Sequence, residues 1–154
     1  MKKRSEGQPE QLNRKIKGLA GLYHGAFSGA AVSDNEFWVW YTLVTMDGEF
    51  SQQDICALWS LPKQTVNTII RRMVRRGMAV LEVVPGTRNR KIIRLTDVGR
   101  EYGETVVMPV SEAEQRAFRR MPEEDQERFL DVMSKYIDML KEELLAAAGG
   151  AVAR

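Results

Sequence analysis

The chain has very little of what metal and redox sites are made of. Among its 154 residues there is one cysteine, Cys56, and one histidine, His24. A single cysteine excludes a disulfide within the chain and suits a reducing compartment. With no second histidine or cysteine at ligand spacing, no metal site is predicted. We expect Cys56 to be a buried, inert thiol and His24 a satisfied helix residue; a redox switch and a pH-sensitive or ligand-contacting group are the alternatives.

Other absences narrow the class of protein. No apolar run reaches the length of a membrane span, and the opening MKKRSEGQPEQ leads into no apolar core of a signal peptide. A cytoplasmic protein without a membrane partner is therefore expected. The sequence also shows no nucleophile–base pair, paired-carboxylate motif or phosphate-binding loop. We therefore expect that the chain is not an enzyme and has no cofactor.

Positive charge is concentrated in the middle of the chain, although the net charge is only +2. Residues 61–100 hold ten lysines and arginines against two acidic residues. Residues 1–60 are close to neutral, with six against seven, and residues 101–154 are acidic, with seven against twelve. A basic centre between neutral and acidic ends predicts one face that binds a polyanion.

Helical periodicity dominates both ends of the chain. Near the start, apolar residues recur at three- and four-residue steps, which predicts an amphipathic helix. Pro109 is expected to break or kink a later helix, with a new stretch from Ser111. Pro122, followed by three acidic residues, is expected to open a long last helix that ends at Gly149 and Gly150. The two apolar stripes are Leu12, Ile16, Leu19, Tyr23, Phe27 and Ala30 in the first helix, and Phe129, Met133, Tyr136, Leu140 and Leu144 in the last.

The segment 51–96 has the order of a winged helix-turn-helix. Ser51 and Asp54 have capping-box spacing and predict a short helix. Ser60-Leu61-Pro62 is expected to turn the chain into a second helix, with Pro62 as its first residue, that stops at Gly77. Two strand-like runs around a basic tip, Met78 to Val84 and Lys91 to Leu95, predict a hairpin wing. Before this segment, a capping box of Ser33 and Glu36 predicts a helix to about Met46, and after it Thr96 is expected to cap the next helix.

The second helix of this segment separates into two faces at about 100° per residue. The apolar arc, which must pack on the preceding helix, holds Val66, Ile69, Ile70, Met73 and Val74; the opposite arc holds Gln64, Asn67, Thr68, Arg71 and Arg75. Amides can bond adenine bidentately, threonine can meet a thymine methyl, and arginine can bridge guanine acceptors.

Residue position along the helix separates contacts to bases from contacts to phosphates. We expect Gln64, Asn67 and Thr68 to approach bases, and Arg71 to contact either bases or phosphate. Arg72, Arg75 and Arg76 come late in the helix and are expected to hold phosphate, while its start near Lys63 can also meet a phosphate. In the wing, Arg88, Arg90 and Lys91 can reach the minor groove. The complete predicted DNA-contact set is Lys63, Gln64, Thr65, Asn67, Thr68, Arg71, Arg72, Arg75, Arg88, Arg90 and Lys91.

Together, SLPKQTVNTIIRRMVRRG, the arginine wing and the closing RLTDVG resemble the MarR family of bacterial transcriptional regulators. The resemblance covers about residues 10–147. It implies a mainly α fold with a small β-hairpin wing (α+β), and a homodimer that binds a palindromic double-stranded DNA operator. Repression by blocking polymerase is the expected outcome, and activation is the alternative, since the position of the operator decides the sign. The resemblance also implies one MarR-like domain over 10–148, with a winged lobe at 33–100 and dimerisation helices at 10–32 and 101–148. The segments 1–9 and 149–154 are expected to be flexible.

Two further expectations come from the resemblance. Relatives often bind small aromatic or anionic effectors in a crevice, which here would be lined by Tyr23, His24, Phe27, Trp38 and Tyr41; the aromatic rings among these can also be plain core. The family's wing usually has an aspartate two residues before its key arginine, and this chain has Gly86 at that distance from Arg88. The choice between Arg88 and Arg90 therefore stays open. A winged-helix protein–protein adaptor without DNA binding is the alternative function.

Overall fold

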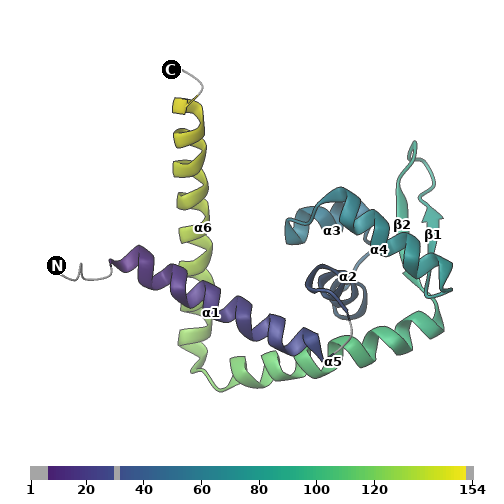
Figure 1. The fold of residues 1–154 in the computed structure, drawn as a ribbon, viewed down its shortest axis with the longest axis horizontal. Coiled ribbons are helices and arrows are strands. Elements are labelled where there is room, and N and C mark those ends of the chain that lie inside the picture. Colours follow the sequence, from purple (N-terminus) through teal and green to yellow (C-terminus); the bar gives the residue numbers. More distant parts are fainter. Residues whose placement is uncertain (1–6, 30–31, 152–154) are drawn as a thin grey trace. The chain divides into compact units, whose positions relative to one another are not determined.

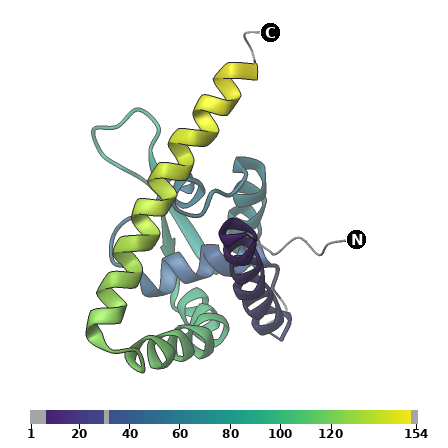
Figure 2. The same cartoon turned by 90° about the vertical axis from the view of Figure 1, so that its left-hand side faces the viewer.

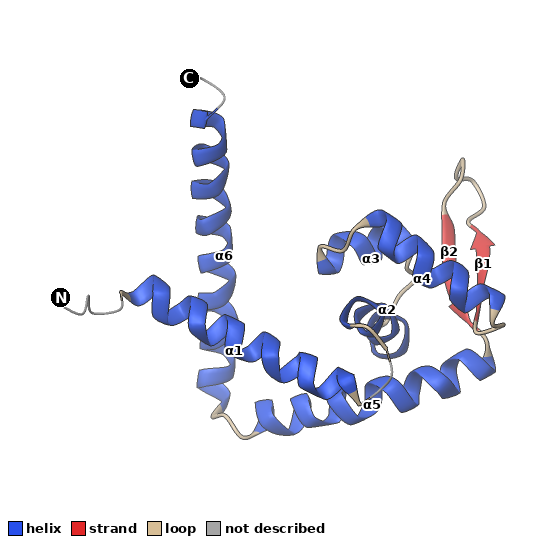
Figure 3. Ribbon diagram, in the orientation of Figure 1, coloured by secondary structure: helices blue, strands red, loops and turns tan. Residues whose placement is uncertain are grey.

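The computed structural model describes residues 7–29 and 32–151. Figure 1 shows the order of the elements, and Figure 3 separates helices from strands. Two compact units share the chain, residues 1–111 and residues 112–154. The described elements are α1 (Gln8–Ser28), α2 (Asp34–Thr45), α3 (Gln52–Trp59), α4 (Lys63–Arg75), β1 (Ala79–Val83), β2 (Lys91–Leu95), α5 (Asp97–Arg119) and α6 (Glu123–Ala151). Helices with one antiparallel hairpin confirm the predicted fold class.

The core of the first unit is built around α2. This helix is apolar on most of its circumference, so it must be covered on several sides. It contacts α1, α3, α4 and β2, and its Phe37, Val39 and Trp40 are completely buried. Phe27 of α1 stacks on Phe37 with ring centroids 3.8 Å apart. α2 therefore fixes where α3 and α4 lie.

The two predicted capping boxes differ in the structure. At α3 the box is complete: the Ser51 amide donates to Asp54 Oδ2 at 2.7 Å, and the Asp54 amide donates to Ser51 Oγ at 3.3 Å. At α2 only half of it forms, because the Ser33 hydroxyl accepts from the Glu36 amide at 3.2 Å while the Glu36 carboxylate turns elsewhere. Pro62 is the residue before α4 rather than its first residue, and Gly77, at φ +68°, ends that helix as expected.

The wing, residues 79–95, is an antiparallel hairpin in which Ala79 pairs with Leu95 and Val83 with Lys91. Its loop of residues 84–90 projects beyond the strands (Figure 2). Pro85 and Gly86 occupy the two central positions of a turn, where the φ of +79° at Gly86 favours glycine. The Thr87 amide closes this turn on the Val84 carbonyl oxygen at 3.3 Å.

The expected break at Pro109 is wrong, because α5 continues through it from Asp97 to Arg119. An interior proline removes one backbone hydrogen bond and costs roughly 3 kcal/mol in a helix. Val106 and Val107 before it and Ser111 after it are buried, so packing on both sides can offset that cost. At the start of α5, Thr96 acts as the predicted cap, since the Gly99 amide donates to Thr96 Oγ1 at 3.1 Å.

The ends of the described chain are more helical than expected. α1 begins at Gln8, inside the segment 1–9 that we expected to be flexible, and α6 continues through both glycines to Ala151. Ala30 of the predicted first stripe lies outside the described residues. Among the described residues, no helix is both long and apolar enough to cross a membrane.

Candidate nucleic-acid interface

α4 presents one apolar and one polar face, as its sequence predicts. Val66, Ile69, Ile70 and Met73 are buried in the first unit. The assignment of Val74 to the buried arc is wrong, since its side chain is 38% exposed. Val74 lies in the last turn of α4.

The opposite face of α4 is open to solvent. Lys63, Gln64, Asn67, Thr68, Arg71 and Arg75 are all exposed, and Thr65 is half-buried. The Thr68 hydroxyl donates to the Gln64 carbonyl oxygen at 2.9 Å. That bond engages its hydrogen and leaves the methyl group available for apolar contact. The structure therefore brings together amides, a threonine and cations on one accessible helix face.

A groove of about 460 Å³ continues this face onto α3. Its α3 wall is Gln52, Gln53 and Cys56, and its α4 wall is Lys63, Gln64, Asn67, Thr68 and Arg71. The sequence analysis did not include Gln52 and Gln53 in the predicted DNA-contact set. Their place in the first turn of a capped helix was a usable signal. The prediction of a buried thiol is wrong: Cys56 is half-buried and lines the groove.

Arg72 has a different environment from the other cations of α4. Its Nη2 donates to Glu36 Oε2 at 2.5 Å, and the same carboxylate accepts from Trp40 Nε1 at 3.4 Å. Glu36 belongs to α2 and is buried, so an unpaired carboxylate there would be costly. This geometry assigns Arg72 a structural role, joining α4 to α2, and argues against the phosphate contact expected from sequence.

The wing cations also differ from one another. Arg88 and Lys91 are exposed, and among the described residues Arg88 has no hydrogen-bond or ion-pair partner. Arg90 Nη2 instead donates to Asp54 Oδ2 at 3.1 Å. Hydrogen bonds from the backbone and side chain of Ser51, together with Arg90, hold the pKa of Asp54 below its usual value. A second groove joins wing and α3 along Ser51, Gln52, Gln53, Asn89, Arg90 and Lys91.

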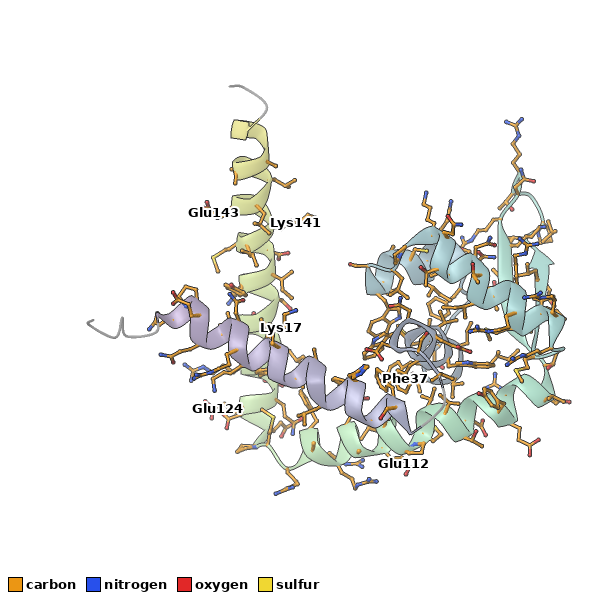
Figure 4. All side chains as sticks on the ribbon, in the orientation of Figure 1. Lys17, Phe37, Glu112, Glu124, Lys141 and Glu143 are labelled. Atoms are coloured by element: carbon orange, nitrogen blue, oxygen red, sulfur yellow. The ribbon has the colours of Figure 1, made fainter. Side chains whose placement is uncertain are left out.

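The residues predicted to line an effector crevice form an aromatic cluster in the first unit. Phe27 is buried, whereas Tyr23, Trp38 and Tyr41 are half-buried. The Trp38 ring centroid lies 5.4 Å from that of Tyr23 and 5.5 Å from that of Tyr41. Figure 4 places Phe37 beside α1 and α2, where it stacks on Phe27.

His24 lies outside this aromatic packing. Its Nδ1 lies 3.0 Å from each carboxylate oxygen of Asp34, and both side chains are largely exposed. The cluster gains a member that the sequence did not indicate, Trp59 of α3, whose ring stacks on Trp38 at 4.4 Å.

Known proteins share this arrangement. Residues 32–88, from α2 to the wing loop, match the MarR family model. A MarR family regulator from Neisseria meningitidis superposes with a TM-score of 0.79 at 22% identity, covering 90% of this chain and 96% of that chain. Staphylococcus aureus MepR in its DNA-binding conformation gives 0.71 at 20% identity, with 87% and 99% covered. CouR from Rhodococcus jostii, solved with p-coumaroyl-CoA, gives 0.66 at 19% identity, with 86% and 93% covered.

A search of curated proteins finds no significant match. At identities near 20% the solved structures establish a shared fold, and the family model adds a match in sequence over the winged lobe. This chain therefore has the winged helix-turn-helix fold of the MarR family regulators, and its residues 32–88 match the MarR family in sequence.

Proposed function

We propose that this chain is a homodimeric, sequence-specific DNA-binding regulator that represses transcription until a small molecule releases it. The observation that carries the proposal is the continuous polar surface formed by the open face of α4, the first turn of α3 and the wing. Amides, a threonine and arginines on one exposed helix suit the hydrogen-bonding edges of the major groove. The solved DNA-binding conformation of MepR supports the same use of a similar fold.

Binding to duplex DNA should depend steeply on salt. The surface offers Lys63, Arg71, Arg75, Arg88 and Lys91 as exposed cations in each chain. A protein that makes about six to ten phosphate contacts loses roughly 10³- to 10⁵-fold in affinity between about 50 and 200 mM salt. We expect a loss of this size when fluorescence anisotropy of a labelled random duplex is titrated at several salt concentrations. No binding at low salt, or a flat dependence, would favour the adaptor function instead.

The proposed homodimer rests on two apolar helix faces that this chain leaves uncovered. In α1, Leu19 is 53% exposed and Leu22 is 73% exposed. In α6, no residue whose side chain the structure describes is buried, and Leu140 and Leu144 are 40% and 60% exposed. Apolar stripes of this length are unfavourable in water and mark contact with another chain. Charged side chains such as Lys141 and Glu143 flank the α6 stripe (Figure 4).

Placing acids in that stripe should separate the dimer. Leu140→Asp combined with Leu144→Asp puts two carboxylates on the apolar face of α6, and we expect monomers in analytical ultracentrifugation because buried, unpaired charges are costly. Lys135→Asp is the matched control, since it adds an acid on the opposite face and removes only an exposed pair with Asp131. A variant that still sediments as a dimer would exclude α6 as the interface.

The proposed effector site is the aromatic cluster. Tyr23, Trp38 and Tyr41 are half-buried, so their rings are accessible to a flat ligand, and CouR was solved with an aromatic acyl thioester. Adding p-coumarate or benzoate to the protein–duplex complex is expected to weaken binding by about fivefold or more, and Trp38→Ala should abolish that response. If neither acid changes duplex affinity or tryptophan fluorescence, the cluster is a core element only.

A further inference from the structure

We propose that Asp54 is a positioning residue for the wing: through Arg90 it holds the loop of residues 84–90 against α3 and leaves Arg88 as the wing arginine presented to DNA. The presentation of Arg88 to DNA rests on the proposed function. The holding of the loop is a property of the free protein and can be tested without DNA.

The backbone explains why an acid of α3 reaches the wing. The Ile93 amide donates to the Phe50 carbonyl oxygen at 2.9 Å, and Ser51 forms an antiparallel bridge with Ile92. The two segments of an antiparallel pair run in opposite directions, so residues after the bridge on one segment lie opposite residues before it on the other. β2 is therefore fixed along the segment that leads into α3, with one end of that contact toward residue 49 and the other toward residue 53.

An ion pair closes each end of this contact. Toward residue 49, Arg94 pairs with Glu49, and it also donates from Nε to Glu82 Oε2 at 2.9 Å. Toward residue 53 the chain has already turned into α3, where the first acid is Asp54, and Arg90 pairs with it at 3.1 Å. An ion pair therefore lies on each side of the Ser51–Ile92 bridge, and the Asp54–Arg90 pair is the one nearer the loop of residues 84–90.

Asp54 is suited to hold an arginine because it is already fixed. Its Oδ2 accepts from the amide and from the hydroxyl of Ser51, each at 2.7 Å. A carboxylate held in one rotamer loses little freedom when a partner binds, so the pair should exceed the near-zero value of many exposed ion pairs. The Asp54 and Arg90 side chains are 39% and 50% exposed, which keeps the interaction modest and reversible.

Arg88 has none of these constraints. It lies between the turn at Pro85–Thr87 and Arg90, is exposed, and has no partner within residues 7–29 and 32–151. The Val84 amide donates to the Arg90 carbonyl oxygen at 2.8 Å, so both ends of the short stretch that carries Arg88 are tied down. A free guanidinium on a stretch fixed at both ends is better placed to enter a narrow groove than one engaged by a carboxylate.

The first arm of the test uses free protein and the hydrogen exchange rate of the Val84 amide. Arg90→Met removes the pair while leaving the capping box intact, and we expect exchange to accelerate about threefold, as a modest ion pair implies. Asp54→Asn should give a similar change, Arg90→Lys should restore part of the protection, and Arg88→Met is the matched control with no change. An unchanged rate in Arg90→Met overturns the holding of the loop.

The second arm measures the salt dependence of duplex binding. Arg88→Met should reduce the slope of log affinity against log salt by about 0.9, the value of one lost contact. Arg90→Met should lower the affinity for duplex while leaving that slope unchanged. In a protein that already carries Arg90→Met, adding Arg88→Met should lower the affinity by a smaller factor than it does in the parent, because the loop no longer holds Arg88 in place. A reduced slope in Arg90→Met, or full additivity of the two substitutions, overturns the assignment of Arg88.

The two arms also separate this inference from the proposed function. If the parent protein binds no duplex at low salt, the proposed function is wrong, and the exchange arm still decides whether Asp54 and Arg90 hold the loop.

Discussion

Replacing Gly99 by alanine is expected to lower the free energy of unfolding by about 3 kcal/mol. A Cβ at this position would overlap the Met78 carbonyl oxygen and lie 2.7 Å from its carbonyl carbon. That oxygen also accepts from the Thr96 amide at 3.1 Å, so it cannot move without breaking the bond between the residue before β1 and the residue before α5. Because the obstacle is backbone, no rotamer change can relieve the overlap. Urea denaturation followed by tryptophan fluorescence measures the loss.

Gly21→Ala is the matched control for this substitution. Gly21 is also helical, and a Cβ there meets nothing within 4 Å. Alanine is favoured over glycine in a helix by up to about 1 kcal/mol, so this variant should be as stable as the parent or slightly more stable. Equal stability of Gly99→Ala and the parent would mean that α5 does not approach the Met78 backbone as closely as the structure shows.

Replacing Asn67 by alanine is expected to reduce the preference for operator over random DNA by about 10- to 100-fold, the equivalent of roughly 1–3 kcal/mol. Asn67 is exposed near the centre of the open face of α4 and lines its groove. An amide there can bond an adenine edge with a donor and an acceptor together, and alanine can do neither. Selection of bound fragments from a random pool, followed by titration of the selected and random duplexes, gives the ratio.

Arg75→Ala is the control for the loss of a nonspecific contact. Arg75 is exposed in the last turn of α4, where we expect it to contact phosphate. Phosphates carry no sequence information, so losing this contact should lower the affinity for every duplex by the same factor. Substitution of Arg75 should therefore weaken binding to selected and random DNA alike. The base-contact assignment is wrong if Asn67→Ala behaves in the same way, with the ratio between the two duplexes unchanged.

Features encoded within a few residues could be predicted from the sequence. The capping box at α3 depends only on Ser51 and Asp54, three positions apart, and it forms as expected. The two faces of α4 follow from helical geometry, so Val66, Ile69, Ile70 and Met73 were correctly placed inside. The glycine stop at Gly77 is equally local, because an αL residue after a helix is a short-range requirement.

Contacts between distant segments could not be predicted. Nothing near Arg72 in the sequence suggested Glu36, 36 residues away, as its partner. Pro109 was expected to break α5, but tertiary packing overrides the local preference at that site. The Asp54–Arg90 pair escaped prediction for the same reason, since it depends on how β2 is seated beside the chain that enters α3.

The ion pairs of the first unit have a consequence for how such a protein would find its target on a chromosome. Arg72, Arg90 and Arg94 are each compensated by an acid from another segment. If the chain binds DNA as proposed, its affinity for random duplex should be lower than the ten basic residues of the central segment imply. Weaker nonspecific binding shortens each encounter with a wrong sequence, which leaves the protein free to move on to other sites.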